Sequence, residues 1–353
     1  MGDVHIVRDL DELESLASAW EGLHASLPSP MQQYAWTRAA AEAFERVVEP
    51  RVVVVDGPHT RAIAALARPR RAAPRLETLG RQLWEPVDFL YEDEGALAEL
   101  IEGLARLGLP LALSRLPLES PAHSILREAF RGSVLREHAR VGAPLIRLDE
   151  SWREPEARFD AGRRSDFRRA RRRAERGGEV TTEIVSPSPD RLAALLDEAV
   201  AVEDRSWKGA RGTSLARDPL RLGFFRLYGK LAAAEGTLRL AFLRVGGRAV
   251  AMQVAVEHGG GFWLLKIGYD RSLARASPGQ LLMLETVRFA AQRGLDTFEF
   301  LGGDEPWTRV WTQEVRPCAS VRVYPRRAAS LAAAAEDALR LGTTAIRARV
   351  RRG

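Results

Sequence analysis

The second half of the chain alternates between short apolar runs and longer amphipathic segments. The apolar runs are bounded by glycines, as at 246–247 and 259–261, which is typical of strands joined by tight turns. The amphipathic segments end at Gly236 and Gly294, which favours helices closed by a glycine. The pattern predicts strands at 180–185, 238–245, 249–257, 262–269, 297–301 and 320–324, and helices at 191–207, 220–234 and 278–293.

The first half repeats this order of elements without local sequence identity. It predicts strands at 4–7, 51–56, 62–67, 111–113 and 145–148, and helices at 10–25, 36–44 and 94–107. Each half therefore runs helix, helix, hairpin, helix, strand, and hairpins require mostly antiparallel pairing. The sequence predicts an α/β (α+β) protein of two similar units rather than one doubly wound parallel sheet.

Composition and charge refine this picture. The chain has 353 residues, of which 46% are apolar, so it can fill real cores and is not mainly disordered. Of its formal charge of +6, residues 163–176 hold eight arginines against two acidic residues, and residues 325–353 hold seven against two. Everything else carries a net −5. We interpret the molecule as an acidic body with a basic helix at 163–176 and a basic amphipathic helix near the C-terminus.

Several classes of protein are excluded. The single cysteine, Cys318, rules out a disulfide scaffold and any all-cysteine metal site. The six histidines are isolated from one another, so we predict no metal site. The N-terminus has neither a basic nor an apolar leader region, and no apolar run approaches ~20 residues. We therefore expect a cytoplasmic protein with no integral membrane association.

The segment most suggestive of chemistry follows the predicted strand 262–269. Ser277 is a favourable N-cap, Pro278 suits the first helical position, and Gln280 would complete a capping box. Gly279 lets a ligand approach the backbone without meeting a Cβ. A helix N-terminus at the end of a strand favours phosphate, and the preceding arginines, Arg271 and Arg275, add to this preference. An ordinary capped helix is the alternative.

A colinear series of short motifs runs from about Met31 to Tyr324. It comprises Ser29–Trp36, Leu79–Gly80, Asp88–Leu90, the basic helix 163–176, Glu203–Trp207, Tyr269–Asp270, Ser277–Leu282, Phe298–Asp304, Trp307 and Trp311. This ordered set resembles the CelD/BcsL-type acetyltransferases, a branch of the GNAT superfamily, and more distantly the FemAB-like peptidyltransferases. The chain departs from the family at Thr308, where a lysine is usual; Arg309 follows.

The resemblance implies two tandem GNAT-like domains with mostly antiparallel mixed sheets flanked by helices. The expected division is an N-terminal GNAT-like domain at 1–150, a basic connecting helix at 151–178, a C-terminal acyltransferase domain at 179–326 and a basic C-terminal helix or tail at 327–353. The second domain is the one expected to bind the donor.

The same resemblance implies direct transfer of an acyl group from acetyl-CoA or another acyl-CoA to an amine, on a small molecule or a carrier. The residues expected to bind the donor form a strand and a pyrophosphate nest. The strand comprises Ile267, Gly268 and Tyr269. The nest comprises Ala276, Ser277, Pro278, Gly279 and Gln280, flanked by Arg271 and Arg275. Asp270 and Asp304 are candidate bases, and Tyr269 is a candidate acid. Both aspartates have a second reading as caps of local turns or helices.

Acceptor-binding candidates are Trp207, Trp307, Arg309 and Trp311. The last two tryptophans lie four apart and share a face if this segment is helical, with core packing as the alternative. The basic helix 163–176 is a solvated surface, a dock for an acidic carrier such as acyl carrier protein or tRNA, or a general nucleic-acid-binding element. The alternatives to acyl-CoA transfer are a tRNA-dependent aminoacyl ligase and a non-catalytic scaffold in envelope polysaccharide synthesis, with cellulose biosynthesis as the implied process.

Overall fold

The computed structural model describes residues 3–24 and 29–350, with side chains described as far as Leu339. The chain divides into two compact units. Unit 1 comprises Met1–Leu27, Met31–Gly142 and Arg316–Gly353, and unit 2 comprises Pro28–Pro30 and Ala143–Val315. The chain therefore leaves unit 1 at Gly142 and returns to it at Arg316, so that the last strand and helix belong to the same unit as the first.

Unit 1 contains two groups of strands. One has the order β1-β3-β4-β7, and the other has the order β9-β15-β8-β6-β5-β2. Most neighbours are antiparallel, with β6 and β8 as a parallel pair. The bounds are β1 (Asp3–Val7), β2 (Val48–Pro50), β3 (Val52–Asp56), β4 (Thr60–Ala64), β5 (Leu66–Pro69), β6 (Leu76–Thr78), β7 (Leu90–Tyr91), β8 (Leu111–Pro117), β9 (Val134–Arg147) and β15 (Val315–Tyr324).

The core of unit 1 lies between these strands and two helices. Asp93 caps α4 (Glu94–Leu107), and Gly108 ends it at φ 65°, a conformation that glycine adopts without strain. The buried face of α4 meets α5 (Ala122–Ala129) and the apolar sides of β3, β4, β8 and β15. The remaining helices are α1 (Leu10–Ser15), α2 (Ala17–His24), α3 (Tyr34–Ala43) and α11 (Ala328–Val350).

Unit 2 is built on the strand order β10-β11-β12-β13-β14-β9, where β9 contributes its final residues, Leu145–Arg147. All of its pairs are antiparallel except β13 with β14. Its bounds are β10 (Val180–Val185), β11 (Leu238–Val245), β12 (Arg248–His258), β13 (Gly261–Tyr269) and β14 (Thr297–Glu299). The parallel pair matters for the candidate site because β14 ends early and leaves the rest of β13 without a partner strand on that side.

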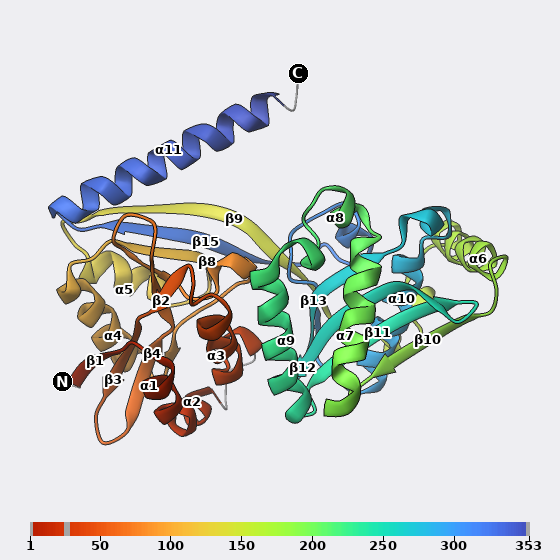
Figure 1. The fold of residues 1–353 in the computed structure, drawn as a ribbon, viewed down its shortest axis with the longest axis horizontal. Coiled ribbons are helices and arrows are strands. Elements are labelled where there is room, and N and C mark those ends of the chain that lie inside the picture. Colours follow the sequence, from red (N-terminus) through yellow and green to blue (C-terminus); the bar gives the residue numbers. More distant parts are fainter. Residues whose placement is uncertain (1–2, 25–28, 351–353) are drawn as a thin grey trace. The chain divides into compact units, whose positions relative to one another are not determined.

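Helices cover both faces of this sheet (Figure 1). The helices α7 (Pro189–Asp204) and α9 (Pro219–Ala234) contact each other and β11, and α7 also contacts β12 and β13. On the other face α10 (Pro278–Gln292) contacts every strand from β10 to β14, and α6 (Ala161–Glu175) lies beside it. Leu282 and Val287 of α10 are fully buried there. The short α8 (Trp207–Ala210) follows α7.

The predicted elements are largely present, but β2, β6, β7 and α5 were not predicted, the strand expected at 297–301 ends at Glu299, and three further elements differ as follows. The helix expected at 10–25 is interrupted at Leu16 and appears as α1 and α2. The strand expected at 62–67 divides into β4 and β5. The strand expected at 145–148 is only the end of β9, whose first part alternates polar and apolar residues and so lacks a continuous apolar run. The C-terminal helix α11 is confirmed.

An aromatic stack holds the parallel pair together. Phe262 and Phe298 are fully buried partners in the β13–β14 register, with ring centroids 5.0 Å apart and planes inclined by 16°. We expect Phe298→Ala to lower the free energy of unfolding by about 3–5 kcal/mol, because it leaves a large cavity. Urea unfolding checks this, with the half-exposed Leu118→Ala as a control expected within about 0.5 kcal/mol of wild type. Equal losses in the two variants would contradict this role of the stack.

Candidate functional site

The strands β13 and β14 part after a short parallel start. They pair only from Gly261 with Thr297 to Trp263 with Glu299, and β13 then continues to Tyr269 without β14 beside it. On its other side β13 remains paired with β12 as far as Tyr269. One edge of Leu264–Tyr269 is therefore unpaired by a strand, and such an edge can bind an extended ligand through backbone hydrogen bonds.

The chain then turns through a 3-10 helix, η6 (Arg271–Ala276), into α10. The predicted capping box is wrong: Ser277 makes no side-chain cap and lies at φ 45°, ψ 48°. Few non-glycine residues adopt this left-handed conformation, and it costs on the order of 1 kcal/mol or more. A left-handed residue just before a helix turns successive amides toward one point, which is the geometry of an anion-binding nest.

Two further residues shape this helix start. A Cβ on Gly279 would lie 3.4 Å from Cδ1 of Tyr269, so a larger residue at 279 meets the tyrosine ring. Gln280 does not cap the helix; its Oε1 accepts a hydrogen bond from Nε1 of Trp311 at 3.0 Å. Pro278 occupies the first helical position as predicted, and Ala276 is buried.

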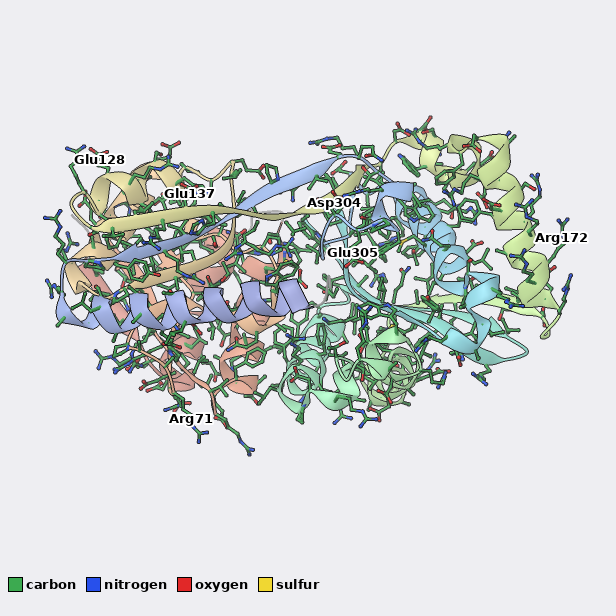
Figure 2. All side chains as sticks on the ribbon, turned by 90° about the horizontal axis from the view of Figure 1, so that it is seen from above. Arg71, Glu128, Glu137, Arg172, Asp304 and Glu305 are labelled. Atoms are coloured by element: carbon green, nitrogen blue, oxygen red, sulfur yellow. The ribbon has the colours of Figure 1, made fainter. Side chains whose placement is uncertain are left out.

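The predicted phosphate-binding arginines, Arg271 and Arg275, are both exposed on η6. A guanidinium NH1 of Arg173 on α6 donates to the Arg275 carbonyl at 3.1 Å. The basic helix therefore lies against the proposed nest and supports it, a role that its sequence did not reveal. Figure 2 shows Arg172, the preceding residue, pointing away from the body of the unit.

Asp270 holds the turn between β13 and η6. Its Oδ1 accepts from the amide and hydroxyl of Ser272 at 3.0 and 2.6 Å. Its Oδ2 accepts from Nε of Arg205 at 2.9 Å and from the guanidinium of Arg248. Burial raises the pKa of the Asp270 carboxyl, but these hydrogen bonds outweigh it and keep the pKa below its usual value. Such contacts favour the turn-capping role over that of a base.

A buried ion pair supports the same strand. Glu203, which is 1% exposed, accepts from Nζ of Lys208 at 2.8 Å and from the Leu215 amide at 2.7 Å. Nζ of Lys208 also donates to the Ile267 carbonyl at 2.8 Å. A Cβ on Gly268 would lie 2.8 Å from Cα of Glu203, so only glycine allows this approach. Sequence reasoning missed this pair because a Glu and a Lys five apart carry no signal of burial.

Asp304 is paired with Arg309 and does not cap a helix. Its two oxygens accept from Nε and NH2 of Arg309 at 2.8 and 2.9 Å. The hydrogen bonds from Arg309 lower the pKa of the Asp304 carboxyl. Thr308, which replaces the lysine of the family pattern, is 1% exposed, and its hydroxyl bonds the amide and carbonyl of Glu305. Where the family pattern has a lysine, this chain therefore has a buried threonine whose hydroxyl binds the local backbone, followed by the exposed Arg309.

The tryptophans differ in their surroundings. Trp311 is 5% exposed and its ring meets those of Phe159 and Phe167. Trp307 contacts Phe300 and donates to Glu305. Only a 3-10 turn, η7 (Thr308–Val310), lies between them, so the α-helix on which a shared face depended is absent from this segment. These contacts favour the core-packing alternative for Trp311.

Trp207 is the most exposed of the three predicted acceptor tryptophans, at 39%. The guanidinium of Arg211 lies 5.0 Å from its ring centroid, within the range of a cation–π contact. Tyr269, Asp270, Ser277 and Gly279 are thus brought together at one turn of the chain. Trp207 is connected to this region by the next residue, Lys208, which donates to the Ile267 carbonyl. Asp304 and Arg309 instead form a separate pair on the loop after β14.

Comparisons with known proteins agree with this geometry. Residues 161–309, which run from α6 into η7, match the family model described as an acetyltransferase (GNAT) domain. This segment is therefore similar to a GNAT acetyltransferase domain, and the parted strands, η6 and the start of α10 all lie in it. A search among curated proteins finds no match.

Solved structures similar to this chain cover most of its length. A structure of FemX has a TM-score of 0.58 at 11% identity and covers 92% of this chain and 97% of its own. The C-terminal DUF2156 domain of a lysylphosphatidylglycerol synthetase-like protein from Agrobacterium fabrum has a TM-score of 0.57 at 14% identity, over 93% and 96%. A tandem GNAT protein from the clavulanic acid pathway has 0.50 at 14%, over 91% and 98%. The predicted fold class, tandem GNAT-like domains with mostly antiparallel mixed sheets, is confirmed.

Two searches for other features found none among the described residues. No group of three His, Cys, Asp or Glu side chains within 3–24 and 29–339 is arranged to hold a metal ion. No helix in the described part of the chain is both long and apolar enough to cross a membrane.

The contacts of Asp270 predict a pH-dependent stability. A carboxyl whose folded pKa is depressed stabilises the protein above its unfolded pKa of about 3.9, and this stabilisation is lost as the pH falls through the folded value. We expect Asp270→Asn to lower the free energy of unfolding by about 1–3 kcal/mol at pH 7, because two arginines lose their acceptor. The deficit should shrink below about pH 4.

Denaturant unfolding at pH 7, 5 and 3 measures this deficit. Asp3→Asn, at an exposed strand residue, is the control and should match wild type throughout. A deficit for Asp270→Asn that stays constant down to pH 3 would show that its carboxylate charge is not what stabilises the turn.

Proposed function

We propose that the chain is an acyl-CoA-dependent N-acyltransferase, acting by direct transfer to an amine on a small molecule or carrier. The observation that carries this proposal is the open edge of β13 leading into a left-handed Ser277 and the N-terminus of α10. The edge suits the amides of a pantetheine arm, and the helix start suits its pyrophosphate. The cytoplasm, where CoA thioesters are made, is the proposed location. The CelD/BcsL subtype belongs to this proposal too.

In this proposal each predicted residue has a role that follows from its position. Ile267, Gly268 and Tyr269 supply the strand edge, and Lys208, paired with Glu203, holds it by donating to the Ile267 carbonyl. The segment Ala276–Gln280 supplies the nest, with Arg271 and Arg275 as exposed charges for the phosphates. Asp270 acts as a positioning residue, because its carboxylate is fully engaged by Ser272 and the two arginines. No metal is needed for direct transfer.

The proton of the amine needs an acceptor, and we assign this role to Asp304. While Arg309 holds it, the low pKa of its carboxyl makes it a weak base. An anionic substrate that draws Arg309 away would raise that pKa and so activate Asp304. Tyr269 would then protonate the leaving thiolate. Trp207 and Trp307 would border the acceptor, as exposed or partly exposed aromatic surfaces.

A tRNA-dependent aminoacyl ligase is the second candidate. The arginines of α6 are almost all exposed, and Arg173 of this helix contacts η6 directly. An anionic carrier such as tRNA or acyl carrier protein that docked on α6 would deliver its acyl group beside the nest. The scaffold alternative requires neither donor.

Gly279→Leu tests the donor site. Because a Cβ at 279 already touches the Tyr269 ring, a leucine fills the approach to the nest, and we expect acetyl-CoA affinity to fall at least about tenfold in calorimetric titration. Gly223→Leu is the matched control, since this helical glycine of unit 2 has no atom within 4 Å of its Cβ position. It should bind as wild type does.

Other results of these binding measurements would count against this proposed function or favour an alternative one. Equal affinity in both variants would remove the nest from donor binding. Absence of acyl-CoA binding in wild type, with salt-sensitive retention of tRNA, would replace the first candidate with the second. A wild-type protein that binds neither would leave the scaffold.

The Asp304–Arg309 pair predicts the pH dependence of the reaction. Arg309→Ala removes the group that lowers the pKa of Asp304, so the acidic limb of the kcat/KM profile should move to higher pH. Asp304→Asn should remove this limb and lower kcat by about 100-fold or more. Arg147→Ala, an exposed arginine paired with Glu314, is the control and should keep the wild-type profile. An unshifted limb in Arg309→Ala would exclude Asp304 as the base.

A further inference from the structure

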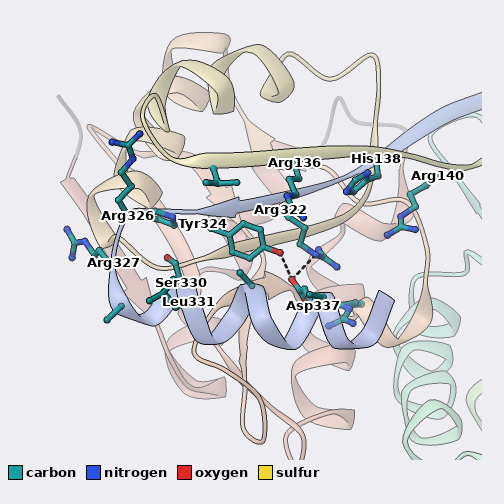
Figure 3. A pocket seen from close by; sticks show the side chains of 16 residues that line it. Arg136, His138, Arg140, Arg322, Tyr324, Arg326, Arg327, Ser330, Leu331 and Asp337 are labelled. Carbon is teal, nitrogen blue, oxygen red and sulfur yellow. Dashed lines mark hydrogen bonds and ion pairs between the residues drawn. The ribbon is translucent and has the colours of Figure 1, made fainter. Parts of the chain in front are cut away.

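Unit 1 contains a large cavity that no part of the proposed reaction uses. It has a volume of about 780 Å³ and lies between the strands β9 and β15 and the helix α11 (Figure 3). Its lining residues fall outside 161–309, the segment matched as an acetyltransferase domain. Cavities that bind small molecules usually measure about 300–1,000 Å³, so this one has the size of a ligand site.

The alternation of β9 and β15 makes one wall of this cavity basic. In β9 the residues at even positions, Val134, Arg136, His138 and Arg140, line the cavity, while Leu135 packs on the core of unit 1. In β15 the even residues Arg322 and Tyr324 line it, while Val321 and Val323 lie in that core. Because side chains of a strand alternate between two faces, a single sheet face collects these cationic groups.

The charges of the cavity are not balanced. It is lined by one carboxylate, that of Asp337, and by six arginines, Arg81, Arg136, Arg140, Arg322, Arg326 and Arg327. Asp337 is already engaged: its Oδ2 accepts from the Tyr324 hydroxyl at 2.7 Å, its Oδ1 lies 2.9 Å from NH1 of the buried Arg75, and Nε of Arg322 is 3.5 Å from its Oδ2. Little of its charge is left for the other arginines.

Arg136 has no carboxylate partner among the residues that the structure describes, whereas Arg326 and Arg327 point away from the cavity (Figure 3), the guanidinium of Arg327 lying against Gly108. Arg140 donates only to the hydroxyl of Ser320, at 2.9 Å. Burial lowers the pKa of Arg322, and neighbouring Arg81 and Arg75 lower it further. The cavity therefore holds cationic groups whose mutual repulsion a bound anion would relieve.

We propose that this cavity binds a soluble small molecule carrying at least two phosphate groups. Guanidinium groups match phosphate oxygens bidentately, and several of them spaced along one strand suit a ligand with more than one phosphate. Val134, Tyr324 and Leu331 give the cavity an apolar portion that accommodates the rest of such a molecule. The site is separate from the proposed donor nest, because all of its residues belong to unit 1.

Calorimetric titration with inorganic pyrophosphate tests this proposal on the full chain. We expect saturable binding that weakens at least about tenfold in Arg136→Ala/Arg140→Ala and that also weakens with added salt. The matched control is Arg106→Ala/Arg131→Ala, which removes the same charge from exposed positions of unit 1 outside the cavity. It should bind pyrophosphate as wild type does. The single variant Arg136→Ala, which breaks no described ion pair, guards against loss of folding.

A second double variant separates this site from the donor nest. Arg271→Ala/Arg275→Ala should leave pyrophosphate binding at the cavity intact, whatever its effect on acetyl-CoA. The proposal is overturned if pyrophosphate binding is lost in this variant and retained in Arg136→Ala/Arg140→Ala, or if both arginine pairs of unit 1 behave alike. Binding to phosphatidylglycerol vesicles but not to pyrophosphate would assign the cavity to a lipid headgroup, and binding to nucleic acid alone would overturn it too.

Discussion

The short parallel contact between β13 and β14 is the constraint on which the candidate site depends. The stacked rings of Phe262 and Phe298 hold the two strands together at their start, and α10 packs across both. Since β14 ends at Glu299 while β13 continues to Tyr269, the backbone of β13 is left open on one side, next to the helix that follows it. A longer β14 would pair that edge and close the site. The length of one strand thus decides whether this sheet can bind a ligand.

The open edge needs support from neighbouring side chains, because an unpaired strand end has few hydrogen bonds to fix it. Lys208 supplies one by donating to the Ile267 carbonyl, and its charge is balanced by the buried Glu203. Asp270 fixes the next turn by drawing Ser272 and two arginines onto one carboxylate. Burying these charged groups costs desolvation free energy, and a buried ion pair by itself adds little to the stability of the fold. Their positions around the end of β13 indicate that they hold its geometry instead.

The sequence predicted the elements around the candidate site but not their contacts. The bounds of β10 and β11 followed directly from apolar runs between turn residues, and the helix starting at Pro278 was expected correctly. The capping box at Ser277 was wrong because the residue adopts a left-handed conformation, which a local motif cannot foresee. The first part of β9 was missed because its arginines and histidine alternate with few apolar residues. Long-range pairs such as Gln280 with Trp311 carry no local signal at all.

The predominance of arginine, 50 of 53 basic residues, has structural consequences whatever its origin. Arg239 binds both oxygens of Glu257, and Arg244 bridges Glu183 and Glu198, arrangements that need a planar fork with several donors. A lysine can lose its proton when buried, whereas arginine remains charged and must find an anion. On most of the surface the acidic residues of the body meet this need. Beneath α11 they do not, since Asp337 serves Arg75, Arg322 and Tyr324 together. Among the described residues no carboxylate pairs with Arg136, so a bound anion would balance a charge that this part of unit 1 leaves uncompensated.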